Sequence, residues 1–91
     1  MSTIVSMYWA WKQKVPPDQK FVLLAFAGDC GQEFLVESDY ESLAEASGLD
    51  IESLKKTLIR LVKSEHLIVE EDSDDDEMTP VYRLNIGEEY L

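Results

Sequence analysis

Residues 38–71 read SDYESLAEASGLDIESLKKTLIRLVKSEHLIVEE, and this stretch decides the fold. It opens with the S-x-x-E spacing of a capping box, which makes Ser38 the expected cap of a first helix. Gly48 supplies a turn after that helix, and Asp50 is the expected cap of the next one. Two capped helices joined by a short glycine turn predict a helix-turn-helix within residues 38–66.

The second of these helices, predicted over 51–64, is amphipathic. Leu54, Leu58 and Leu61 recur at spacings of four and three, which gives one apolar face that points inward. The basic residues fall largely on the other side, where they are candidates for contacts with phosphate or with an acidic protein: Lys55, Lys56, Arg60 and Lys63. The alternative is a solvated face that is stabilised by pairs such as Glu52 with Lys56 at i,i+4.

Upstream of this stretch the pattern predicts two helices and a short strand. A helix over 4–14 ends before Pro16–Pro17, because a residue that precedes proline avoids the helical region. The following helix, over 18–29, contains FVLLAFA and is apolar almost all round, as expected for the buried centre of a small domain. The segment EFLVE at 33–37 is predicted to form a brief strand.

Downstream, strands are predicted from 67–69 and over 81–86, with an acidic connection over 70–80. The predicted fold is therefore α+β: a winged helix-turn-helix of three to four helices, with a small antiparallel β-hairpin as its wing over 67–87. We expect one domain over residues 1–91, since a chain of 91 residues has room for a single modest core.

Trp9 and Trp11 lie about 200° apart on a helix of 3.6 residues per turn. Both side chains cannot point into one core, so we expect one to be buried and the other to be exposed. An exposed tryptophan would either anchor an interface or cover the edge of the domain.

Composition excludes several classes of protein. No apolar run approaches the ~20 residues that a bilayer span needs, so no membrane association is expected. The single cysteine, Cys30, cannot form an intramolecular disulfide, which indicates a cytoplasmic protein, and we expect it to be a small packing residue. No phosphate-binding loop, dinucleotide fingerprint or catalytic motif is present, so we expect no enzymatic activity, cofactor or metal. His66 is expected to end the second helix near the negative pole of its dipole.

Charge is the unusual property of the chain. Nineteen acidic residues face eight basic ones, for a formal net charge of −11, and the acid is concentrated toward the C-terminus. Such a charge repels nucleic acid at long range unless the bases gather on one face. The densest acidic run begins where the predicted wing begins, and its carboxylates are the candidate partner-binding residues: Glu70, Glu71, Asp72, Asp74, Asp75, Asp76 and Glu77. The alternatives for this run are a solvated loop and, on incomplete D-x-D-x-D spacing, a calcium site.

Four groups of residues resemble the winged-helix domains at the N-terminus of phage replication-initiation proteins and related phage helix-turn-helix regulators. They are Trp9-Ala10-Trp11, Lys20-Phe21-Val22-Leu23-Leu24, Leu43-Ala44 with Gly48-Leu49, and Leu61 through Leu67-Ile68, over about residues 8 to 70. The resemblance implies that 51–64 is the recognition helix and 70–80 the wing. The chain departs from DNA-binding members of the family, because Asp50 and Glu52 stand early in the recognition helix and the wing is acidic.

Two functions are consistent with these features. The first is a non-enzymatic protein that binds a host protein or nucleoprotein complex with a basic surface, as an inhibitor of a DNA-handling or defence system such as a CRISPR effector. The second is a transcriptional regulator or replication-initiation module that reads the major groove with helix 51–64, and this one would require a dimer or a wing that faces away from the duplex. Net charge favours the first, since a carboxylate against phosphate is repulsive. A homodimer is compatible with both.

Overall fold

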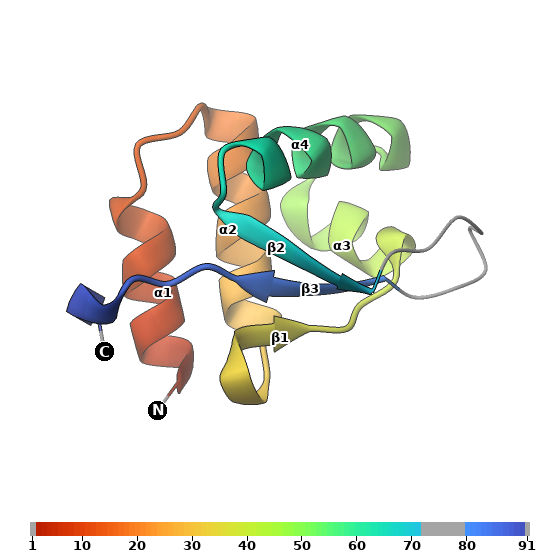
Figure 1. The fold of residues 1–91 in the computed structure, drawn as a ribbon. Coiled ribbons are helices and arrows are strands. Elements are labelled where there is room, and N and C mark those ends of the chain that lie inside the picture. The colour runs from red at the N-terminus through yellow and green to blue at the C-terminus, as the bar shows by residue number, and fades with distance from the viewer. Residues whose placement is uncertain (1, 72–79, 91) are drawn as a thin grey trace.

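The computed structural model describes residues 2–71 and 80–90, and the side chains of Ser2, Thr3 and Gln32 are not described. It is an α+β fold with four α-helices and a three-stranded antiparallel sheet (Figure 1), as the sequence predicted at this level. In chain order the elements are α1 (Ser2–Lys12), α2 (Pro17–Asp29), the 3₁₀ turn η1 (Gln32–Phe34), β1 (Leu35–Val36), α3 (Tyr40–Ser47), α4 (Ile51–Lys63), β2 (Leu67–Glu71), β3 (Val81–Leu84) and the 3₁₀ turn η2 (Glu88–Tyr90).

Helix α2 is the centre of the fold. Figure 1 shows it behind the sheet, with α1 on one side and with α3 and α4 on the other. Its residues Val22, Leu23, Phe26 and Ala27 are fully buried, as the apolar FVLLAFA segment predicts. The ring of Phe26 lies 5.8 Å from the ring of Tyr82 on β3, which joins the helical layer to the sheet.

Helix α1 ends two residues earlier than predicted, at Lys12. The Lys20 ammonium on α2 donates to the carbonyl oxygens of Ala10 at 3.1 Å and Trp11 at 2.6 Å. A cation at the last carbonyls of a helix satisfies groups that have no partner within the helix. This cap comes from another helix, so no local pattern around α1 could indicate it.

Strand β1 is shorter than the predicted 33–37. Glu33 and Phe34 take positive φ angles of 59° and 61°, so the chain forms a 3₁₀ turn before it extends. Positive φ is incompatible with a strand. Only Leu35 and Val36 pair with β3, opposite Arg83 and Tyr82.

The two helices after β1 are joined as expected, but the first cap is a different residue. Asp39, rather than Ser38, caps α3, and its carboxylate accepts a hydrogen bond from the backbone N–H of Ser42 at 2.7 Å. The Ser38 hydroxyl instead donates to the Asp29 carboxylate at the end of α2. Gly48 closes α3 in the left-handed conformation at φ 78°, and the prediction that Asp50 caps α4 is confirmed by a 2.7 Å bond from the N–H of Ser53.

The sheet has the order β1-β3-β2, with both pairs antiparallel. The hairpin strands differ from their predicted bounds, since β2 extends through Glu71 and β3 ends at Leu84. Glu70 and Glu71 therefore belong to a strand and not to the connection. The register between β2 and β3 shifts between Val69 and Glu71, which marks a bulge.

One hydrophobic cluster joins all four helices to the sheet. Trp9 is 2% exposed and Trp11 is 69% exposed, so the expectation of one buried and one exposed tryptophan is confirmed. Cys30 is buried and forms no disulfide, in keeping with its predicted packing role. Among the described residues, no helix is long and apolar enough to cross a membrane.

Candidate functional site

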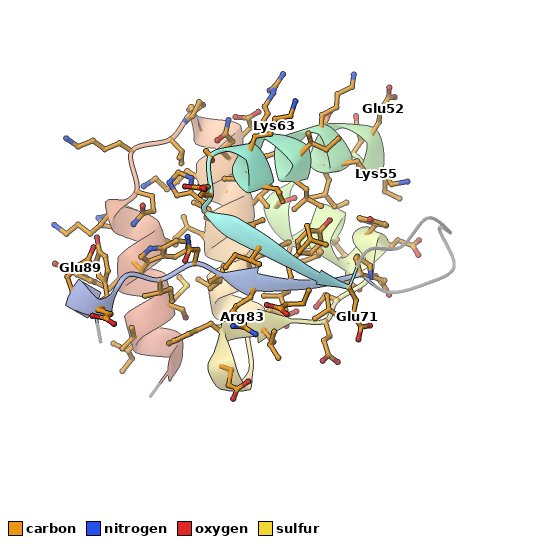
Figure 2. All side chains as sticks on the ribbon, in the orientation of Figure 1. Glu52, Lys55, Lys63, Glu71, Arg83 and Glu89 are labelled. Atoms are coloured by element: carbon orange, nitrogen blue, oxygen red, sulfur yellow. The ribbon has the colours of Figure 1, made fainter. Side chains whose placement is uncertain are left out.

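The basic residues of α4 point away from the core, but three of the four contact groups of the same chain. The Lys55 ammonium lies 4.9 Å from the centre of the Tyr40 ring on α3. Lys56 approaches Glu52 at 3.7 Å, in the i,i+4 pair that the sequence predicts. Arg60 approaches Asp18 of α2 at 3.8 Å, while Lys63 is exposed (Figure 2). These ion pairs are solvated and weak, yet each places a carboxylate beside a basic side chain and so reduces the positive charge of this face.

The N-terminal turn of α4 is occupied by a carboxylate of the chain itself. Free N–H groups at the start of a helix bind anions such as phosphate. Here Asp50 accepts from one of them, and the backbone hydrogen bond from Ser53 lowers the pKa of Asp50 below its usual value. Asp39 caps α3 in the same way, and the backbone hydrogen bond from Ser42 lowers its pKa. Both carboxylates are fully ionised at neutral pH, so α3 and α4 each carry a negative charge at their first turn.

Further carboxylates lie on and beside α3. Glu41 and Glu45 are exposed on α3, and Glu37 is exposed between β1 and α3. A surface pocket lies between the end of α2 and β1, and its lining includes the carboxylate residues Asp29 and Glu37. This face of the molecule is therefore acidic from the end of α2 to the end of α3.

The two hairpin carboxylates within the described part of the chain have different environments. Glu70 forms a 2.9 Å ion pair with Arg83 across the β2–β3 pair. Glu71 is exposed at the last position of β2, where Figure 2 places it at the far end of the sheet from α1. The other predicted partner-binding residues, Asp72, Asp74, Asp75, Asp76 and Glu77, lie outside the described residues, and so does the D-x-D-x-D spacing. Sequence reasoning grouped Glu70 with this run and missed its pair with Arg83, because cross-strand pairing depends on a register that only the fold sets.

His66 lies three residues beyond the end of α4 and immediately before β2. Its Nδ1 atom is 2.7 Å from the Ser64 hydroxyl, and its ring lies 6.3 Å from the ring of Trp9. Burial lowers its pKa, whereas the negative pole of a helix would raise it. His66 lies where the chain leaves α4, as expected, since its backbone N–H donates to the Leu61 carbonyl in the last turn of that helix at 3.0 Å. Its ring packs against Trp9 of α1.

Among the residues that the structure describes, no three His, Cys, Asp or Glu side chains gather in a way that could hold a metal ion. Two groups of charged side chains stand out in the described part of the chain: the partly compensated bases of α4, and the carboxylates at the end of α2, along α3 and at the end of β2.

No family model matches this chain, and no curated protein or solved structure matches it either.

Proposed function

We propose that this chain is a winged helix-turn-helix protein without enzymatic activity, and that it binds a protein or nucleoprotein machine with a basic surface through its acidic hairpin. The winged-helix assignment is supported by the order of elements: α3, a glycine turn and α4 are followed directly by the antiparallel pair β2 and β3. In this fold α4 is the recognition helix and the β2–β3 hairpin is the wing.

The charge around α4 is the observation that carries the proposal. The start of the recognition helix, which meets base edges in DNA-binding members of the fold, carries Asp50 and Glu52 here. Its Lys56 and Arg60 lie beside carboxylates. A duplex against this face would meet three carboxylates, those of Asp18, Asp50 and Glu52, beside the four bases, and each desolvated contact between like charges costs several kcal/mol, roughly.

The wing, in contrast, favours a basic surface on the partner. Beginning at Glu71, the sequence places carboxylates at 71, 72, 74, 75, 76 and 77 with no base among them. Carboxylates spaced this closely in the sequence resemble the phosphates of a nucleic acid strand in charge, and lysine and arginine sites bind both. The proposed action is therefore occupation of basic sites that the partner uses for DNA, which would make the protein an inhibitor of a DNA-handling or defence system.

The direct test compares two variants of equal charge. In the wing variant, Asp72, Asp74, Asp75 and Asp76 become Asn and Glu77 becomes Gln, so five neutralised charges change −11 to −6. In the matched control, Gln replaces five carboxylates elsewhere in the chain: Glu33, Glu37, Glu41, Glu45 and Glu65. Binding is measured by fluorescence anisotropy with a labelled oligo-arginine peptide and with a labelled duplex of random sequence at low salt.

We expect the native protein and the control to bind the peptide with similar affinity and the wing variant to bind it at least about tenfold more weakly. We also expect no binding of the duplex. Equal losses in the two variants would mean that net charge, and not the wing, is recognised, and this would contradict the proposal. A partner captured from a host lysate should in addition be displaced by duplex DNA.

The second candidate is a DNA-binding regulator or replication module, and one observation favours it. Lys56, Ile59 and Lys63 lie on one face of α4, and all three are exposed. Steeply salt-dependent binding of duplex DNA that Lys56→Glu and Lys63→Glu abolish would establish this function and exclude the first.

A further inference from the structure

Helix α1 is apolar on two opposite faces. One face packs on α2 through Trp9 and Ala10, and the buried Ser6 hydroxyl on the same face donates to the Ala27 carbonyl at 2.9 Å. The other face is open to solvent and presents four large apolar side chains at i, i+3, i+4 and i+7: Ile4 (73% exposed), Met7 (37%), Tyr8 (55%) and Trp11 (69%). A helix that is hydrophobic all round is normally buried on all sides. In a single copy of this chain, however, only one face of α1 is buried.

The exposed face, which we call the α1 stripe (Ile4, Met7, Tyr8 and Trp11), is large for a chain of this size. Its two aromatic residues alone expose more than half of their surface, and the four side chains together expose on the order of 500 Å². A contiguous patch of this area marks an interaction site in many monomers. With a polar rim it approaches the ~800 Å² per partner of a stable interface.

We propose that the α1 stripe packs against the α1 stripe of a second copy of this chain, in an antiparallel two-fold homodimer. The stripe is bordered by both basic and acidic residues, so the bases of one copy can pair with the acids of the other. Helix α1 and the residues after it carry Lys12 and Lys14 and no acid up to Asp18. The turn η2 carries Glu88 and Glu89, and it lies beside α1, where the ring of Tyr90 is 6.0 Å from the ring of Tyr8.

A two-fold interface places each patch against the same patch of the other copy, so a residue i that contacts j is matched by j contacting i. Lys12 and η2 both border the Tyr8 ring within one copy, since the Lys12 ammonium lies 5.4 Å from the centre of that ring. Across the two-fold axis, the lysines at the end of α1 in one copy can then meet the η2 carboxylates of the other. Figure 2 shows Glu89 beside α1, on the side of the molecule away from the sheet. A partner with a purely acidic or purely basic rim would satisfy only one of these two charged edges.

The position of α1 also suits a second copy of an acidic chain. Figure 1 shows α1 at one end of the molecule and α3 at the other. Two copies joined through α1 therefore hold their acidic α3 and β2 ends far apart, beyond the ~8 Å screening length at physiological salt. This inference does not rest on the proposed function.

Sedimentation equilibrium tests the dimer. The native protein should show a mass of about 21 kDa at high micromolar concentration, twice the 10.4 kDa of one chain, and should dissociate on dilution. Trp11→Glu and Tyr8→Glu should each raise the dissociation constant about 30-fold or more, as expected for anchors at the centre of an interface. Ile59→Glu is the matched control, because Ile59 on α4 is as exposed as Tyr8, at 55%, and lies outside the stripe.

Far-UV circular dichroism should show the same helix content in all of these variants, since every substituted side chain is exposed. A native protein that stays at the mass of one chain at high micromolar concentration overturns the proposal, and so does a control that dissociates as readily as Trp11→Glu.

A charge exchange tests the two-fold arrangement itself. Lys12→Glu with Lys14→Glu changes the net charge from −11 to −15, and Glu88→Lys with Glu89→Lys changes it from −11 to −7. Each double variant alone places like charges across both edges and should be monomeric. An equimolar mixture should form a heterodimer, because the carboxylates introduced at the end of α1 in one chain would face the ammonium groups introduced on η2 of the other, even though both chains remain negative overall. Failure of the mixture to associate would rule out the antiparallel arrangement.

Discussion

The two helix caps show how single residues set the start of α3 and α4. Asp39 and Asp50 each accept a backbone N–H three residues ahead at 2.7 Å. The sequence identified Asp50 correctly because only one capping residue precedes α4. It failed at α3 because Ser38 and Asp39 are adjacent and both can cap. In the structure the Ser38 hydroxyl donates to the carboxylate of Asp29, which lies nine residues upstream, so Ser38 does not cap α3.

The first prediction concerns the cap of α4. Asp50→Ala removes the acceptor for the N–H of Ser53 and should lower the Tm by about 4 °C or more. Asp50→Asn is the control, since it keeps an oxygen acceptor at the cap and should lose less than half as much. Both changes are measured by thermal denaturation followed at about 222 nm. Equal losses for Ala and Asn would show that the charge at the start of the helix, and not the hydrogen bond, stabilises α4.

The second prediction concerns the pH dependence that His66 contributes. Burial lowers the pKa of His66 in the folded protein, so the unfolded chain binds the proton more readily. The stability that comes from neutral His66 is fully present above the unfolded pKa of about 6.5 and is lost as the pH falls toward the lower folded pKa. The free energy of unfolding in urea should therefore decline as the pH falls below about 6.5. His66→Gln should flatten this part of the profile, and an unchanged slope in the variant would assign the decline to other groups.

The turn between α3 and α4 depends on one glycine. Gly48 has φ 78°, its N–H bonds to the Ala44 carbonyl, and a Cβ atom built at this position would meet no atom within 4 Å. The requirement for glycine therefore comes from its own left-handed backbone conformation and not from contacts with neighbouring elements.

The third prediction follows from that geometry. Gly48→Ala should lower the free energy of unfolding by about 1 kcal/mol, which is the cost of placing an L-residue in the left-handed region. Gly31→Ala is the matched control, because a Cβ there also meets no atom within 4 Å and its φ is not positive. It should be neutral or slightly stabilising, since alanine restricts the unfolded chain. Chemical denaturation measures both, and equal effects at the two glycines would refute the role of the turn.

The elements differ in how far the sequence could predict them. The helices and the hairpin were predictable because apolar spacing, caps and glycine turns are local signals. The pairing of β1 with the sheet could not be predicted, because its partner β3 lies more than forty residues away and a strand of two residues has no periodicity. The α1 stripe was missed for a related reason. Ile4, Met7, Tyr8 and Trp11 have helical spacing in the sequence, but only the packing of the opposite face on α2 shows that this face is left open.

At the scale of the whole molecule, charge opposes folding. The acidic residues exceed the basic ones by eleven within a body of 35 × 25 × 22 Å. Ion pairs compensate some of the acids in the described part of the chain, as they do for Asp18, Glu52 and Glu70. Because the excess is eleven, most of the acidic charge stays uncompensated, and its repulsion in the folded state is relieved by expansion.

The last prediction is that salt stabilises this protein. At about 0.01 M salt the screening length is roughly 30 Å, which is comparable to the whole molecule, whereas at about 0.15 M it is roughly 8 Å. Repulsion across the fold is then screened while the contacts of the core are unchanged, so the Tm should rise over this range. The surface ion pairs weaken at the same time, but exposed pairs contribute little. Because both carry five fewer negative charges, the wing variant and its matched control, each at −6, should show reduced dependence on salt. Differential scanning calorimetry in NaCl and in Na₂SO₄ at equal ionic strength separates screening from ion-specific exclusion, since screening gives the same shift in both salts. A Tm that falls with NaCl would mean that ion pairs outweigh the repulsion, and the acidic surface would then be a source of stability.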